Sequence, residues 1–119
     1  MYDLYDTGNI VRLYRIIRRE LPTYMDFLSG KALARHPPPT DPVFLRVWVG
    51  VSTYAALAQA RGTAARYPRL GIFIAALDVP TTLEAFRIER SLGTVGHCTV
   101  WGDPYMLSSR IHALFPVEG

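Results

Sequence analysis

The sequence predicts one α+β domain over residues 1–119, built on a small mixed or antiparallel sheet with a few helices. A chain of 119 residues is close to the commonest size of a single domain. Half of the residues are apolar and 19% are charged, which provides a hydrophobic core and excludes a disordered chain. Strand-like and helix-like segments follow one another in an irregular order, which favours α+β over a doubly wound sheet.

Residues 11–17 are expected to form the first strand because they are rich in β-branched and aromatic side chains. The spacing of their apolar residues is also compatible with a helix. In a strand, Leu13, Arg15 and Ile17 share one face. Arg15 then points the same way as apolar neighbours, and a charge on a buried face needs a partner or a ligand.

Two helices and a stiff loop are expected next. Apolar residues at helical spacing predict a helix from Pro22 to Arg35, with Gly30 as a weak point. The three consecutive prolines of residues 37–39 predict a surface loop. Asp41 and Pro42 then have the pattern of an N-cap and first helical residue, and this short helix ends at Gly50.

The middle of the chain gives the clearest local pattern. An Ala-rich helix is expected over Ala55–Tyr67, with Ser52 or Thr53 as its N-cap. The continuous apolar run Leu70–Val79 predicts a strand in the interior of the sheet. The inward-facing residues expected on the helix are Leu57, Ala60 and Ala64.

Shorter elements complete the predicted fold. Alternating apolar and charged residues in Thr82–Leu92 predict a half-exposed strand. A second short strand or extended loop follows over Thr94–Trp101. Asp103 is expected to cap a helix that begins with Tyr105–Ser109, and Arg110–Val117 closes the fold as a strand.

The composition excludes several classes of protein. No apolar run is long enough to span a membrane, and the first residues are not a secretion signal, so a cytoplasmic protein without a membrane partner is expected. Cys98 is the only cysteine, and His36, His97 and His112 lie far apart in the sequence, so neither a disulfide framework nor a metal site is predicted.

The net charge of +3 comes almost entirely from arginine, since Lys31 is the only lysine. Arginine binds phosphates and carboxylates bidentately, but a GC-rich genome or a warm habitat explains the same bias. The basic residues are scattered, so nucleic acid is not expected as the main partner. The exception is the group Arg12, Arg15, Arg18 and Arg19.

Three pieces of the chain, taken in order, resemble the ADP-ribosyltransferase-like superfamily. They are a strand bearing Leu13, Tyr14 and Arg15, the segment 50–54 leading into a helix, and residues 96–104. In that family an Arg or His on the first strand, a Ser-Thr-Ser or Tyr-bearing second motif and a Glu on the third strand form the NAD site. The resemblance implies an ADP-ribosyltransferase-like fold and a nucleotide-binding domain that uses NAD as a glycohydrolase or in ADP-ribosyl transfer.

The resemblance also implies roles for individual residues. Arg15 would hold a phosphate of the dinucleotide, Ser52 and Thr53 would shape the pocket, and Tyr54 would lie beside the nicotinamide. This agrees with the bidentate binding of phosphate by arginine and with the stacking face of an aromatic ring.

The third motif departs from the family pattern. Residues 97–99 offer His97 and Thr99 where a Glu is expected, and the candidate substitutes are Glu84, Glu89 and Asp103. Positive charge develops on the sugar as the nicotinamide leaves, and a nearby carboxylate normally stabilises it. His97 is the candidate catalytic residue, as a hydrogen-bond partner of a ribose hydroxyl or as a general base.

A second interpretation is a non-enzymatic interaction module. In it, Arg15 pairs with an acid such as Asp26 or Glu89 instead of a ligand. The proline loop of residues 37–39 and exposed aromatic side chains would then form a protein-binding surface, with a homodimer as the simplest assembly.

Overall fold

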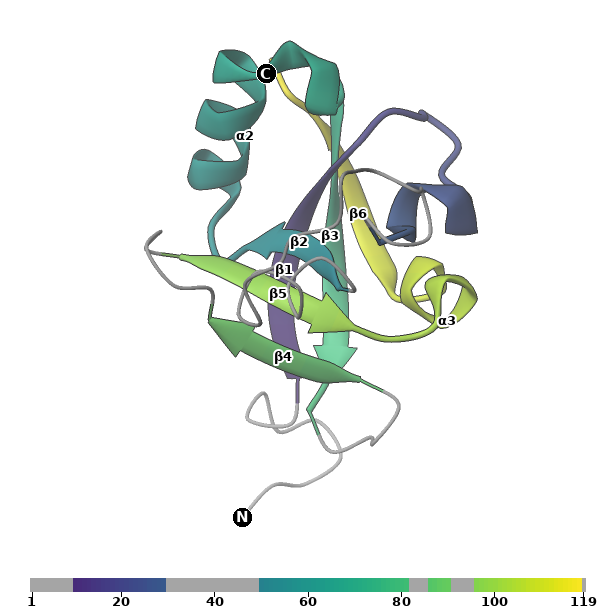
Figure 1. The fold of residues 1–119 in the computed structure, drawn as a ribbon. Coiled ribbons are helices and arrows are strands. Elements are labelled where there is room, and N and C mark those ends of the chain that lie inside the picture. Colours follow the sequence, from purple (N-terminus) through teal and green to yellow (C-terminus); the bar gives the residue numbers. More distant parts are fainter. Residues whose placement is uncertain (1–9, 30–49, 82–85, 91–95, 119) are drawn as a thin grey trace, which may run out of the picture.

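The computed structural model describes residues 10–29, 50–81, 86–90 and 96–118. They form an α+β fold built on one six-stranded antiparallel sheet in the order β4-β5-β2-β1-β3-β6 (Figure 1). The expected α+β class and the antiparallel sheet are therefore confirmed. The strands are β1 (Ile10–Ile17), β2 (Val51–Tyr54), β3 (Phe73–Pro80), β4 (Arg87–Arg90), β5 (His97–Trp101) and β6 (Ile111–Pro116).

The strand β1 confirms the strand interpretation of residues 11–17. It pairs with β3 without interruption from Ile10 opposite Pro80 to Ile17 opposite Phe73. The side chains alternate between two core clusters on opposite faces of the sheet. Between β1 and β6, β3 has the interior position that its apolar sequence predicts.

The sheet divides into two halves at the junction of β1 and β2. These two strands share a single register pair, Tyr14 opposite Tyr54. In Figure 1, β2, β5 and β4 run across the direction of β1, β3 and β6. The strands β1 and β2 therefore separate on leaving this pair, and the larger core fills the space between the halves.

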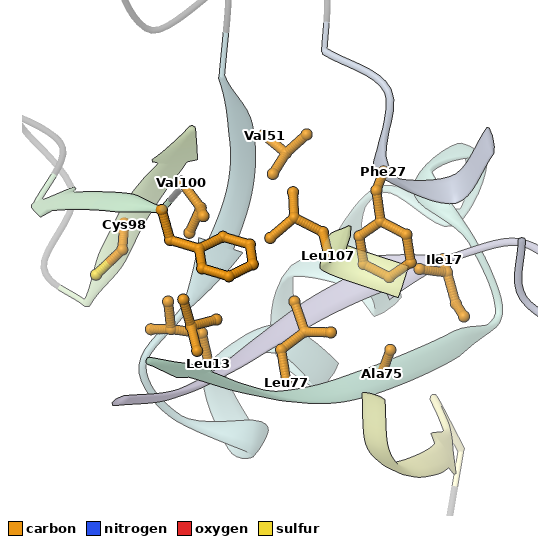
Figure 2. Close-up of a cluster of buried hydrophobic side chains, with 11 residues drawn as sticks. Leu13, Ile17, Phe27, Val51, Ala75, Leu77, Cys98, Val100 and Leu107 are labelled. Carbon is orange, nitrogen blue, oxygen red and sulfur yellow. The ribbon is translucent and has the colours of Figure 1, made fainter. Parts of the chain in front are cut away.

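The larger core combines side chains from both halves of the sheet and from two short helices. Figure 2 shows Leu13 and Leu77 from one half facing Val100 from the other. Phe27 and Leu107 are fully buried in the same cluster. Phe27 comes from the 3-10 helix η2 (Tyr24–Phe27), and Leu107 comes from α3 (Pro104–Ser108).

Helix α2 (Leu57–Arg66) covers part of the opposite face of the sheet. Ala60 and Ala64 are buried against Ile16 and Ile74, as the inward-facing pattern predicts. The expected N-cap at Ser52 or Thr53 is wrong, because both residues pair with β5 inside β2. The residue before the helix is Ala56, which makes no side-chain capping bond.

The helix expected from Pro22 to Arg35 is interrupted after its first turn, and residues 30–35 lie outside the described residues. One 3-10 turn, η2, is closed by a capping box between Thr23 and Asp26, and the chain is extended at Leu28. The proline loop of residues 37–39 and the helix expected from Asp41 lie outside the described residues.

The C-terminal elements agree with their predicted types. Residues 87–90 form the edge strand β4, and the strand alternative for residues 97–101 is confirmed by β5. The Asp103 carboxylate accepts hydrogen bonds from the backbone N–H groups of Tyr105 and Met106, which makes it the N-cap of α3. A second 3-10 turn, η3 (Pro68–Leu70), joins α2 to β3. None of the helices in the described ranges is long and apolar enough to cross a membrane.

Candidate functional site

The candidate site is the cleft that opens where β1 and β2 diverge. It is a pocket of about 160 Å³ between the second half of β1 and the start of β2. The two strands part after their single register pair, so their backbone groups and side chains flank an open space. The lining residues are Arg15, Ile16, Leu28, Gly50, Val51, Ser52, Tyr54 and Leu70.

Arg15 lines this cleft and bonds to two neighbouring segments. Its Nε donates to the backbone oxygen of Asp26 over 2.8 Å, and its Nη1 donates to the backbone oxygen of Ser52 over 2.8 Å. One guanidinium thus links β1 to η2 and to β2. Both acceptors are backbone carbonyl oxygens, and together they fix the orientation of the guanidinium.

The Asp26 carboxylate is engaged by other groups. Its Oδ1 lies 3.0 Å from Nη1 of Arg19, and its Oδ2 accepts from the backbone N–H of Thr23 over 3.0 Å. The Asp26 side chain is only 2% exposed, so these partners satisfy a buried charge. Glu89, the other acid considered for Arg15, bonds to Arg87 on the edge strand. Arg15 therefore contacts Asp26 as predicted, but its hydrogen bond is to the backbone oxygen of Asp26 and not to the carboxylate.

Ser52, Thr53 and Tyr54 do not all face the cleft, because they belong to a strand. Ser52 is exposed and Tyr54 is largely buried, and both line the pocket with Arg15. Thr53 is fully buried, is not among the lining residues, and its hydroxyl donates to the backbone oxygen of Cys98 over 2.9 Å. Thr53 is thus placed to hold β2 against β5, while its two neighbours shape the cleft.

His97 lies behind Tyr54 as seen from the cleft. It stands opposite Tyr54 in the pairing of β2 with β5, and the two rings meet edge to face with centroids 5.2 Å apart. His97 does not line the pocket. Burial lowers the pKa of His97 from its ordinary value near 6.5, so the imidazole is neutral at pH 7. The structure therefore brings together Arg15, Ser52 and Tyr54, with His97 in contact with the last.

The structure adds apolar residues that the sequence did not indicate. Leu28 follows η2 and Leu70 ends η3, so both reach the cleft from short turns that have no distinctive sequence pattern. The eight residues lining this pocket include no carboxylate. Asp103 caps α3, and Glu84 lies outside the described residues. In the part of the chain that the structure describes, no group of three or more His, Cys, Asp or Glu side chains is arranged to hold a metal ion.

Comparison of the chain with protein-family models, with curated proteins and with solved structures finds no match. The geometry of the cleft is therefore the basis for a functional proposal.

Proposed function

We propose that this chain is an ADP-ribosyltransferase-like nucleotide-binding domain that binds NAD in the cleft between β1 and β2. One observation carries the proposal. The guanidinium of Arg15 is held by two carbonyl oxygens in a pocket that it shares with a serine hydroxyl and a tyrosine ring. A guanidinium held in a fixed orientation is a bidentate ligand for phosphate.

Each cleft residue has a role in this proposal. Arg15 binds a phosphate of the dinucleotide, and the hydroxyl of Ser52 donates to or accepts from the sugar or phosphate. The ring of Tyr54 packs beside the nicotinamide, and His97 supports that ring from behind. The pocket of about 160 Å³ is smaller than the roughly 300–1,000 Å³ of typical ligand sites, so it holds only part of a dinucleotide.

Binding is a stronger proposal than catalysis for this site. Cleavage of the nicotinamide–ribose bond needs stabilisation of positive charge on the sugar, and the pocket lining supplies no carboxylate. His97, the candidate general base for a glycohydrolase or ADP-ribosyl transfer reaction, does not line the pocket, and it would have to reach the substrate past Tyr54. The neutral imidazole that burial favours is the form able to accept a proton.

Calorimetric titration with NAD, ADP-ribose and nicotinamide tests the proposal. We expect saturable binding of NAD and ADP-ribose, and loss of that binding in Arg15→Ala. Arg87→Ala is the matched control, because it removes the same charge from the edge strand β4 away from the cleft. Absence of binding at millimolar ligand to the unaltered protein would rule the site out.

A second candidate is self-association through a groove beside the edge strand β6. A groove of about 610 Å³ runs between the end of α2, the start of β3 and the end of β6, and its lining is mostly apolar. Ile72 in this groove is 62% exposed, and β6 is an edge strand of the described sheet. Sedimentation equilibrium tests this, with a dimer expected that Ile72→Glu dissociates; a monomer at high concentration would exclude it.

A further inference from the structure

A second pocket adjoins the candidate NAD site at the start of β2. It has a volume of about 190 Å³ and shares Gly50 and Val51 with the first pocket. The two pockets are therefore neighbouring parts of one cleft that follows β2. We call the second one the apolar pocket, after its lining.

The apolar pocket is lined by core side chains and by small residues. Phe27, Val51 and Val100 line it and are buried in the larger core (Figure 2). The other lining residues are Ser29, Gly50, Gly102 and Pro104. The described residues around this pocket thus include no charged side chain. A pocket of this kind suits a flat, uncharged group with apolar faces.

Two short elements hold the walls of the apolar pocket in place. Phe27 ends η2, and Pro104 begins α3. The ring of Tyr24 on η2 stacks on the ring of Tyr105 on α3, with the centroids 4.2 Å apart. This contact fixes the spacing of the two walls, and a pre-organised pocket lowers the entropic cost of binding.

The order of positions along β2 matches the order of parts in a dinucleotide. NAD has a nicotinamide ring at one end, an adenine ring at the other and a pyrophosphate between them. In the proposed site the nicotinamide lies beside Tyr54, and Arg15, which bonds to the backbone oxygen of Ser52, holds a phosphate. Gly50 lies two residues before Ser52, about 7 Å away at the usual rise of an extended chain. The apolar pocket at Gly50 therefore follows the phosphate position, where the second ring belongs.

Volume and charge both favour the apolar pocket for this ring. A different pocket beside Arg15, of about 140 Å³, is lined in part by Arg18, Arg19 and Asp26, whose charges lose hydration against an uncharged ring. The apolar pocket has no such cost. Its volume, added to that of the first pocket, brings the cleft into the range of roughly 300–1,000 Å³ that ligand sites usually occupy.

Building on the proposed function, we infer that the apolar pocket binds the adenine ring of the dinucleotide. The ligand lies along β2, with the nicotinamide beside Tyr54, the pyrophosphate at Arg15 and the adenine between η2 and α3. The chain then binds NAD more tightly than nicotinamide mononucleotide, which lacks the adenine half.

Gly102→Val is the sharpest variant for a test, because its added side chain takes up space in the apolar pocket. Gly50 is less suitable, since a side chain there would meet the side chain of Thr99. Gly62→Val is the matched control. Position 62 is exposed on α2, and a Cβ added there meets no other atom within 4 Å.

The experiment measures the dissociation constants of NAD and nicotinamide mononucleotide by calorimetry for the unaltered protein and both variants. We expect the unaltered protein to bind NAD about tenfold or more tightly, as burial of one ring predicts. In Gly102→Val that ratio should fall to within about threefold, with the affinity for nicotinamide mononucleotide unchanged, whereas Gly62→Val keeps the full ratio. Gly102→Ala should give a smaller fall and serves as the test if Gly102→Val does not fold.

The results that would overturn the inference are distinguishable from failure of the proposed function. Equal affinities of the unaltered protein for the two ligands would refute the adenine pocket and leave the site at Arg15 intact. A ratio that stays unchanged in folded Gly102 variants would also refute it, as would an equal loss of affinity for both ligands. Failure of both ligands to bind the unaltered protein would refute the proposed function and the inference with it.

Discussion

Replacing Arg15 by alanine should destabilise the fold as well as weaken ligand binding. The guanidinium makes two charge-assisted hydrogen bonds that tie β1 to η2 and β2. The bond to Ser52 matters most for the architecture, because β1 and β2 have only one register pair of their own. A bond from a charged donor contributes about 1.5–3 kcal/mol, and the bond to Ser52 is solvent-exposed and belongs at the low end.

The expected loss in the free energy of unfolding is therefore about 3–4.5 kcal/mol. Urea denaturation followed by circular dichroism measures it, and at the slope usual for a small domain the midpoint should fall by roughly 1–2 M. Arg15→Lys keeps the positive charge but lacks the planar fork that reaches both carbonyls, so an intermediate loss is expected. A free energy of unfolding for Arg15→Ala within about 0.5 kcal/mol of the original would refute the bridging role.

Three further predictions concern other positions. Thr53→Val removes the hydroxyl bonded to the Cys98 carbonyl and should cost about 1 kcal/mol of stability in urea denaturation, with no change in ligand affinity; weaker ligand binding would place Thr53 in the site. Asp103→Ala removes the N-cap of α3 and should lower the unfolding free energy by about 1 kcal/mol, an effect that Asp103→Asn should largely avoid. Burial lowers the pKa of His97 in the folded protein, so at mildly acidic pH the unfolded chain binds this proton more strongly than the folded one. The free energy of unfolding should therefore fall as the pH drops below about 6.5. Unfolding free energies measured between pH 7.5 and 5.5 should fall less in His97→Gln, and identical pH profiles would contradict the buried environment of this imidazole.

The strand β1 shows how much of the structure can be predicted from the local sequence pattern. Its β-branched and aromatic content predicted a strand, and the two-residue alternation placed Arg15 on the face of Leu13 and Ile17. Because the neighbouring face residues are core residues, the prediction that Arg15 needs partners is confirmed. The partners themselves were not predictable, since backbone carbonyls brought close by tertiary structure leave no trace in the sequence pattern.

The N-cap expected at Ser52 or Thr53 failed for a similar reason. Hydroxyl residues suit a helix N-cap and a strand about equally, and the deciding interaction is with β5, more than forty residues later in the chain. Because neighbouring residues of a strand point to opposite faces, Ser52 lines the cleft and Thr53 does not. Likewise, the helical turn predicted after Pro22 ends at Phe27, and the next residue, Leu28, is extended. The side chain of Phe27 is buried in the core, a tertiary contact that helical spacing alone does not predict.

The candidate site, like the fold, was predictable from the sequence only in part. The group of arginines at residues 12–19 was visible in the sequence, but the sequence did not show that three of its members line one pocket. The pocket is completed by Leu70, which reaches it from η3 through tertiary packing. The sequence therefore predicted the strand that carries Arg15, but it did not predict the pocket that Arg15 shares with Arg18 and Arg19.

The most direct test of the proposed NAD site is to map ADP-ribose binding by NMR on the uniformly ¹⁵N-labelled protein. We predict that amide shift changes concentrate in residues 15–19 and 50–54 and at Leu28 and Leu70, the residues around the cleft. Changes centred on the groove at Ile72 and Val117, or no changes at millimolar ADP-ribose, would contradict a nucleotide site between β1 and β2.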